Sequence, residues 1–308
     1  MTRGSLPSRV EIREVCPRDG FQSVKEKIFT KDKIALIDAM AETGVSVMEV
    51  TSFVSPKAIP QMSDASEVMT HFNERWSGKV KSVVLVPNVK GAENALKVSP
   101  DSLNFVLSAS ASHNRANTRR TIEESLAELK EVKSLCGDVE LGLSVATSFQ
   151  CPFEGAISPD AVVNIVEKAM EIGVGTVTLA DTIGTCDPVY LSSTLSQIKK
   201  VFGDYPFFLH LHDTHGMAMV NTMIAMEMGF YRFDSATGGL GGCPFAPGAA
   251  GNSATEDMVN FFDRVGVSSG VDLERVLAIA DRMKTMGLPV NSHMSSYRAG
   301  CSSLSCEG

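Results

Sequence analysis

Two histidines stand two residues apart in the apolar stretch FLHLHDTH, at positions 208–215. On a β-strand, side chains at i and i+2 point to the same side, so His210 and His212 would face one place. Such a pair indicates a metal site. Two core histidines satisfied by hydrogen bonds are the alternative for this pattern taken alone. Two imidazoles rarely make a full coordination shell, so other parts of the chain must supply the remaining ligands.

The elements that would position such a site alternate regularly along the chain. Short apolar or β-branched runs predict eight strands, at 10–15, 45–53, 80–87, 103–110, 139–146, 175–181, 206–213 and 231–238. A helical pattern follows each of them. Eight βα units at a spacing of roughly 30 residues predict an α/β fold of the (β/α)8 TIM barrel type. An open doubly wound sheet is the alternative, but the count reaches eight and no GxGxxG motif follows the first strand.

A single catalytic domain is expected to account for residues 1–308. The barrel would cover about 10–265, an additional C-terminal helix about 272–287, and a polar tail 288–308. No linker or low-complexity segment indicates a second domain.

The composition excludes several classes of protein. With a net charge of −8, the chain is unlike a nucleic-acid or membrane-surface binder. No apolar run approaches the roughly 18–20 residues of a membrane span. The start MTRGSLPSRV has no apolar h-region, so we expect no signal peptide and a cytoplasmic location. The seven cysteines are scattered and form no CxxC, which argues against a disulfide framework or a structural zinc site.

In TIM barrels the chemistry lies at the C-terminal ends of the strands. Polar side chains gather at those ends in this chain. They are Arg18, Asp19, Glu49, Thr51, Ser52, Asn88, His113, Asn114, Thr147, Ser148, Asp181, His210, His212 and Asn252. The Asp19 carboxylate and the Asn252 carbonyl could join the two histidines around one cation, with water in the remaining positions. This hard donor set suits octahedral Mg²⁺ or Mn²⁺ better than tetrahedral zinc.

The segment 238–251 contains six glycines and two prolines around Cys243. Such a loop can bend sharply and approach a ligand closely, although a flexible connector is the alternative. A cysteine in such a glycine-rich loop at the mouth of a barrel occupies the position expected of a mobile acid/base or nucleophile.

Five motifs together resemble the 3-hydroxy-3-methylglutaryl-CoA lyase family, within a superfamily of metal-dependent lyases and Claisen-type synthases on a TIM barrel. They are EVCPRDGFQ (14–22), MEVTSFVSPKAIPQMSD (48–64), ADTIG (180–184), HLHDTHG (210–216) and GGLGGCPFAPGAAGNSATED (238–257). The resemblance covers about 10–290. It implies a (β/α)8 barrel that cleaves a 3-hydroxyacyl-CoA with the help of one divalent cation, Mg²⁺ or Mn²⁺.

The resemblance also implies roles for individual residues. The metal ligands would be Asp19, His210, His212 and Asn252. Arg18 would neutralise the thioester enolate, Glu49 would lie near the metal and its water, Asp181 would act as acid or base, and Cys243 would be the catalytic acid. The base that deprotonates the 3-hydroxyl would be either His210 or Asp181. Substrate contacts are expected from Gln22, Ser52, His113 and Asn114.

One departure from the family concerns the segment 108–125, where His113, Asn114 and Asn117 stand beside three arginines, Arg115, Arg119 and Arg120. These residues would contact an acyl carboxylate or the phosphates of CoA, or else begin a solvated helix. The departure leaves the acyl group open. Besides 3-hydroxy-3-methylglutaryl-CoA, the substrate could be citramalyl-CoA or a longer 3-hydroxy-3-alkylglutaryl-CoA.

Two further readings of the sequence are disfavoured. A Claisen-type synthase acting on a 2-oxo acid would usually carry a C-terminal regulatory domain, for which we expect no room here. A non-catalytic binding protein would have lost polar residues at the strand ends, and none of the expected ones is missing. We expect a homodimer or higher homo-oligomer, because barrels of this family usually pair.

Overall fold

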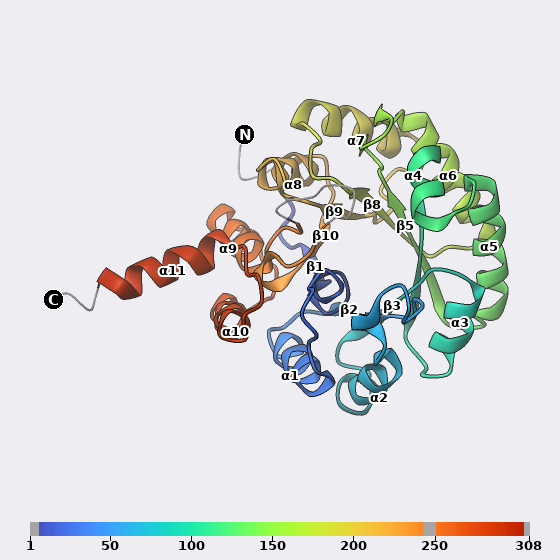
Figure 1. Ribbon diagram of the computed structural model, residues 1–308. Coiled ribbons are helices and arrows are strands. Elements are labelled where there is room, and N and C mark those ends of the chain that lie inside the picture. Colours follow the sequence, from blue (N-terminus) through green and yellow to red (C-terminus); the bar gives the residue numbers. More distant parts are fainter. Residues whose placement is uncertain (1–5, 243–250, 305–308) are drawn as a thin grey trace.

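The computed structural model describes residues 6–242 and 251–304 (Figure 1). Eight parallel strands form a closed barrel in the order β1-β10-β9-β8-β5-β4-β3-β2. They are β1 (Glu11–Glu14), β2 (Val47–Ser52), β3 (Lys81–Val86), β4 (Ser102–Ser108), β5 (Glu140–Ala146), β8 (Thr176–Asp181), β9 (Phe208–Leu211) and β10 (Arg232–Ser235). The ring closes because Glu14 of β1 pairs with both Met48 and Ser235. The predicted TIM barrel is confirmed, and each predicted strand overlaps one observed strand.

A ring of helices covers the barrel (Figure 1). These helices are α1 (Thr30–Ala41), α2 (Ala65–Trp76), α3 (Val89–Leu96), α4 (Ala111–Thr118), α5 (Ile122–Leu135), α6 (Pro159–Ile172), α7 (Pro188–Phe202), α8 (Ala218–Glu227) and α9 (Thr255–Val265). Helix α6 shows how local sequence sets their bounds. Ser158 caps it with Pro159 in the first turn, and Gly173 ends it in the left-handed region at φ 94°.

The strands are buried on both faces, but the two faces differ in character. On β4, Leu103, Phe105 and Leu107 belong to the hydrophobic core beneath the helices. The alternate residues Asn104 and Val106 face the barrel interior. The interior is therefore partly polar, and this places hydrogen-bonding groups beneath any site at its mouth.

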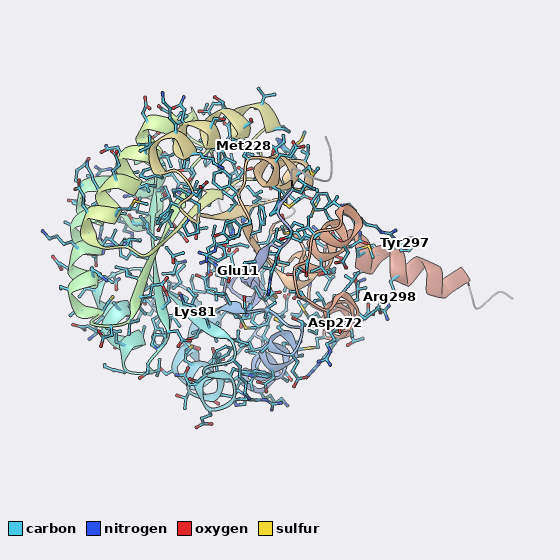
Figure 2. All side chains as sticks on the ribbon, turned by 180° about the vertical axis from the view of Figure 1, so that it is seen from behind. Glu11, Lys81, Met228, Asp272, Tyr297 and Arg298 are labelled. Atoms are coloured by element: carbon cyan, nitrogen blue, oxygen red, sulfur yellow. The ribbon has the colours of Figure 1, made fainter. Side chains whose placement is uncertain are left out.

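Ion pairs lie at the N-terminal end of the barrel. Arg232 pairs with Glu11 at 2.8 Å, and Lys81 pairs with Glu140 at 2.5 Å. Figure 2 labels Glu11 and Lys81, seen from behind the barrel. The polar side chains discussed below lie toward the opposite end.

The C-terminal part of the chain adds two helices. The expected additional helix is α10 (Leu273–Thr285). The segment expected to be only a polar tail contains α11 (His293–Leu304), which extends away from the barrel (Figure 1). This helix begins where the Asp257 carboxylate accepts hydrogen bonds from the backbone N–H groups of His293 and Met294. The tail prediction is corrected because this cap comes from a distant residue.

Two small elements were not predicted. A π-helical turn, η2 (Cys16–Gly20), follows β1 directly, and a short hairpin joins β6 (Gln150–Cys151) to β7 (Gly155–Ala156). None of the helices in the described part of the chain is long and apolar enough to cross a membrane.

Candidate metal centre and active site

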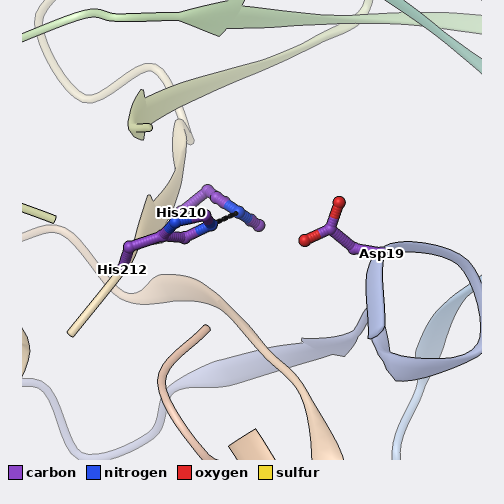
Figure 3. Close-up of side chains that lie close together, drawn as sticks. All are labelled: Asp19, His210 and His212. Atoms are coloured by element: carbon purple, nitrogen blue, oxygen red, sulfur yellow. Dashed lines mark hydrogen bonds between the residues drawn. The ribbon is translucent and has the colours of Figure 1, made fainter. Parts of the chain in front are cut away.

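Three predicted ligands converge at the C-terminal end of the barrel. Asp19 lies on the turn η2, His210 on β9, and His212 just beyond β9. Asp19 and His212 are buried and His210 is mostly buried, and one ligand atom of each lies within 4.8 Å of those of the other two. The Nε2 atoms of the two histidines are 3.0 Å apart, and the Asp19 carboxylate faces them (Figure 3). The prediction that both imidazoles face one place is confirmed.

The protonation of these groups suits a cation. Burial by itself would raise the pKa of Asp19, but Arg18 and the two histidines outweigh it and lower that pKa to about 2. Burial and the neighbouring His210 lower the pKa of His212 to about 4, so its imidazole is neutral near pH 7. A buried carboxylate beside a neutral imidazole is a donor set in the ionisation state that divalent metals bind. The residues present therefore fit a metal such as Mg²⁺ or Mn²⁺.

His210 differs from His212 in its surroundings. Burial lowers its pKa, but the hydrogen bond from its Nδ1 to Asp234, at 3.0 Å, and the charge of that carboxylate raise it above its ordinary value. A cation must therefore compete with a proton at His210, and its affinity should rise with pH.

Asn252, the fourth expected ligand, lies against the other three. Its Nδ2 donates to Asp19 Oδ2 at 2.7 Å and to the Leu240 carbonyl at 2.8 Å. Its backbone forms an isolated bridge with that of His212. The side chain thus borders the candidate metal centre, and its role as a ligand stays a prediction.

Arg18 and Glu49 form an ion pair beside this centre. The guanidinium of Arg18 contacts both the Asp19 and the Glu49 carboxylates. The second oxygen of Glu49 accepts a hydrogen bond from Asn104 Nδ2 at 2.9 Å. Two carboxylates therefore hold the guanidinium at the pocket wall, where it can meet negative charge on a ligand. Gln22 donates to Asp19 at 2.9 Å and also lines the pocket.

Asp181 ends β8 but is not among the residues that line the pocket, where its neighbours Ala180 and Thr182 lie. Its carboxylate accepts hydrogen bonds from the backbone N–H groups of Cys186, at 3.1 Å, and Thr185, at 3.4 Å. Burial raises its pKa to about 6, against these hydrogen bonds. The group is therefore ionised at neutral pH and can be protonated about one unit below it.

The segment 108–125 reaches the pocket through helix α4. His113 lines the pocket together with Asn117, one helical turn later. Its Nδ1 lies 2.6 Å from Ser108 Oγ, and its backbone N–H donates to the capping residue Ser110. Burial lowers the pKa of His113, which favours the neutral imidazole. A hydrogen-bonding ring therefore forms part of the pocket wall, and its contact with substrate stays a prediction.

Asn114 does not point into the pocket. Its Oδ1 accepts from Ser108 N, and its Nδ2 donates to the carbonyls of Arg120 and Thr121 and to Ser125 Oγ. Both N–H groups of the amide are used in joining α4 to α5, and the residue is buried and does not line the pocket. The expected substrate contact of Asn114 is corrected on this ground.

Two other predicted residues have different outcomes. Ser52 is buried at the end of β2, and its hydroxyl has no hydrogen-bond partner within the described ranges. It does not line the pocket, so its contact with substrate stays a prediction. Cys243 lies outside the described residues. Gly242, directly before it, lines the pocket.

Polar residues within the strands were not predicted as part of the site. Ser144, Thr178 and Asp234 line the pocket from β5, β8 and β10. Charged side chains inside runs expected to be buried, such as Asp234 and Arg13, were the available signal, because a buried charge needs a partner.

Comparisons with known proteins extend over nearly the whole chain. The family described as HMGL-like matches residues 9–283. A hydroxymethylglutaryl-CoA lyase of Bacillus subtilis strain 168 is 39% identical over 289 residues, which cover 93% of this chain and 96% of that protein. The human mitochondrial hydroxymethylglutaryl-CoA lyase is 39% identical over 276 residues, covering 89% and 84%.

A solved structure is also similar to this one over nearly its whole length. It is an HMG-CoA lyase from Acinetobacter baumannii in complex with coenzyme A and 3-methylmalate, with a TM-score of 0.89 and 40% identity over 96% of both chains. The range matched by the family, residues 9–283, contains Asp19, His210, His212 and Asn252.

Proposed function

Since the chain belongs to the HMGL-like family, we propose that it cleaves 3-hydroxy-3-methylglutaryl-CoA to acetyl-CoA and acetoacetate with one divalent cation. The observation that carries this proposal is the convergence of Asp19, His210 and His212 beside the guanidinium of Arg18. A metal centre next to a fixed positive charge suits a reaction in which a hydroxyl loses its proton and a thioester becomes an enolate.

The reaction breaks the C2–C3 bond. The 3-hydroxyl loses a proton, its oxygen becomes the carbonyl of acetoacetate, and the electrons of the broken bond pass to the thioester as the enolate of acetyl-CoA. Bound at Asp19, His210 and His212, with Asn252 beside them, Mg²⁺ or Mn²⁺ would make the hydroxyl more acidic. Arg18, held by two carboxylates, stabilises the negative charge on the thioester oxygen. One such preorganised contact contributes about 2.7–4 kcal/mol to transition-state stabilisation.

Two residues would transfer the protons. His210 has its Nδ1 at Asp234 and its Nε2 at the metal position. The base would be either His210 or Asp181, which ends β8 between the pocket-lining residues Ala180 and Thr182. Cys243 would then protonate C2 of the enolate and release acetyl-CoA.

The acyl group is proposed from the relatives of this chain. The curated relatives named above are hydroxymethylglutaryl-CoA lyases, at about two-fifths identity. A second candidate is a lyase of the same mechanism that acts on citramalyl-CoA or on a longer 3-hydroxy-3-alkylglutaryl-CoA. The observation that favours it is His113 in the pocket wall, within the segment that departs from the family pattern. We keep the cytoplasm as the proposed location and a homodimer or larger homo-oligomer as the proposed assembly.

Steady-state cleavage of a substrate panel tests the acyl group. The protein with Mg²⁺ is offered 3-hydroxy-3-methylglutaryl-CoA and both enantiomers of citramalyl-CoA, and acetyl-CoA release is followed. The highest kcat/KM for the first substrate supports the proposal. A higher value for citramalyl-CoA would keep the mechanism and reject the acyl group, whereas no cleavage of any of them would reject the lyase proposal.

A further inference from the structure

A buried chain of hydrogen bonds leads from the barrel interior to one of the proposed ligands. Arg13 Nε donates to Asp234 Oδ1 at 2.8 Å, and Arg13 Nη2 donates to Asp234 Oδ2 at 2.7 Å. Asp234 Oδ2 lies 3.0 Å from Nδ1 of His210. Arg13 and Asp234 are almost inaccessible to solvent, at 3% and 5% relative exposure. These hydrogen bonds therefore lie inside the barrel.

The register of the strands places these three residues side by side. Arg13 of β1 pairs with Asp234 of β10, and Asp234 pairs with His210 of β9. Neighbouring residues in register project to the same side of a sheet, so the three side chains meet inside the barrel. Their contact is a consequence of the barrel's hydrogen-bonding pattern and needs no loop to arrange it.

Arg13 is itself fixed from two further sides. Its Nη2 also donates to Thr178 Oγ1 of β8 at 2.8 Å. Its guanidinium stacks 4.4 Å from the centre of the Phe208 ring. A guanidinium held in this way presents two parallel N–H groups to the Asp234 carboxylate. The two hydrogen bonds fix the positions of both carboxylate oxygens.

The contact between Asp234 and His210 determines the orientation of the imidazole ring. Both oxygens of Asp234 already accept hydrogen bonds from Arg13, so the ionised carboxylate can only be an acceptor and Nδ1 of His210 must be the donor across their 3.0 Å contact. The Nε2 lone pair is then left for the side where His212 and Asp19 lie. His212 has no such support, since its buried Nδ1 has no hydrogen-bond partner within the described ranges.

We infer that Arg13 and Asp234 are positioning residues of the metal centre, which hold His210 with Nδ1 protonated and Nε2 directed at the cation. The inference rests on the proposed metal-dependent function and adds to it two residues from the strands that close the barrel. Neither residue would touch the metal or the reacting atoms.

Metal affinity measures this role directly. Isothermal titration of the apoprotein with Mn²⁺ should give a Kd about 10–100-fold higher for Asp234→Asn than for the wild type, as for other residues that orient a metal-binding histidine. Asp64→Asn is the matched control, because Asp64 forms a largely buried ion pair with Lys33, at 2.8 Å, between α1 and the start of α2. Its Kd for Mn²⁺ should equal that of the wild type.

A second variant guards against misfolding, since Asp234→Asn leaves the buried charge of Arg13 unpaired. The double variant Arg13→Met, Asp234→Asn removes both charges and should fold, with a melting temperature close to that of the wild type. It should also bind Mn²⁺ about 10–100-fold more weakly than the wild type. A folded double variant with wild-type affinity would overturn the inference.

The orientation of the ring is a readout that does not depend on metal. Nitrogen chemical shifts of ¹⁵N-histidine-labelled apoprotein, recorded at a pH at which the ring is neutral, should show Nδ1 of His210 protonated and Nε2 unprotonated in the wild type. This preference should be lost in the double variant. A wild type with that signature that binds no Mn²⁺ would reject the proposed metal centre and, with it, this role. Mn²⁺ binding that is unchanged in the double variant would reject the positioning role alone.

Discussion

Gly241 offers a sharp test of the geometry around the proposed metal centre. Its φ of +138° is a backbone conformation that other residues rarely adopt. A Cβ atom at this position would lie 2.1 Å from Asn252 Nδ2 and 3.4 Å from Asp19 Oδ2. Gly241→Ala therefore forces a methyl group into the contact between Asn252 and Asp19.

The size of the effect follows from these distances. Ordinary contacts of a Cβ atom begin near 3.4 Å, so the amide nitrogen of Asn252 must move by about 1 Å or more to escape a contact at 2.1 Å. Such a shift breaks its 2.7 Å hydrogen bond to Asp19, which contributes about 1.5–3 kcal/mol as a bond to a charged group. The backbone strain adds about 1–3 kcal/mol to the destabilisation. We expect a lower melting temperature and a Kd for Mn²⁺ raised about 10–100-fold.

The neighbouring glycine supplies the control. A Cβ atom on Gly242 would meet nothing within 4 Å among the described residues. Gly242→Ala should therefore stay within about 0.5 kcal/mol of the wild-type free energy of unfolding, as for ordinary surface substitutions. Its Mn²⁺ affinity should be unchanged.

The assay is a paired titration of both apoproteins with Mn²⁺, together with thermal melts. We predict weak binding for Gly241→Ala and wild-type binding for Gly242→Ala. Wild-type affinity in Gly241→Ala would refute the reasoning, because it would mean that the position of Asn252 against Asp19 has no bearing on the metal.

The remaining predictions concern individual residues of the site. Cys243→Ala should reduce turnover at least about 100-fold while Mn²⁺ affinity is kept, and His212→Ala should lose Mn²⁺ binding itself; full activity in either variant would contradict its assigned role. Because burial raises the pKa of Asp181 to about 6, kcat/KM should fall as the pH drops through 6, and a flat profile from pH 5 to 8 would exclude Asp181 as the base. Because the pKa of Asp181 is higher in the folded protein than in the unfolded chain, its protonated form stabilises the fold. The free energy of unfolding of the wild type, measured by urea denaturation, should therefore fall relative to that of Asp181→Asn as the pH rises from about 3.8 to 6, by up to about 3 kcal/mol. His113→Ala should change the ratio of kcat/KM between 3-hydroxy-3-methylglutaryl-CoA and citramalyl-CoA by more than about tenfold, while Arg115→Ala, at an exposed position of the same helix, should leave that ratio unchanged.

Features with a local cause could be predicted from the sequence. The eight strands follow from short apolar runs, and the two-residue spacing of His210 and His212 places both rings on one side of β9. Asp19 could be predicted as a third ligand because the C-terminal ends of the strands meet at one mouth of the barrel. These inferences need only the periodicity of a strand and the closure of the barrel.

Features set by distant partners could not be predicted. Asn114 stands beside His113 in the sequence, but its amide joins α4 to α5, and polarity alone does not separate the two roles. Helix α11 depends on capping by Asp257, 36 residues before His293. The pairing of Arg13 with Asp234, 221 positions apart, depends on the register in which β1 meets β10. A sequence shows which charges need partners, but only the closed barrel shows which partners they have.

The most direct test of the proposed function is metal-dependent cleavage of 3-hydroxy-3-methylglutaryl-CoA by the wild-type protein, stripped of metal with EDTA and then supplied with Mg²⁺ or Mn²⁺. We predict that acetyl-CoA and acetoacetate form in equal amounts, that EDTA abolishes the reaction, and that added cation restores it. Cleavage that persists without a divalent cation would contradict the assignment of Asp19, His210 and His212 as the metal centre on which the reaction depends.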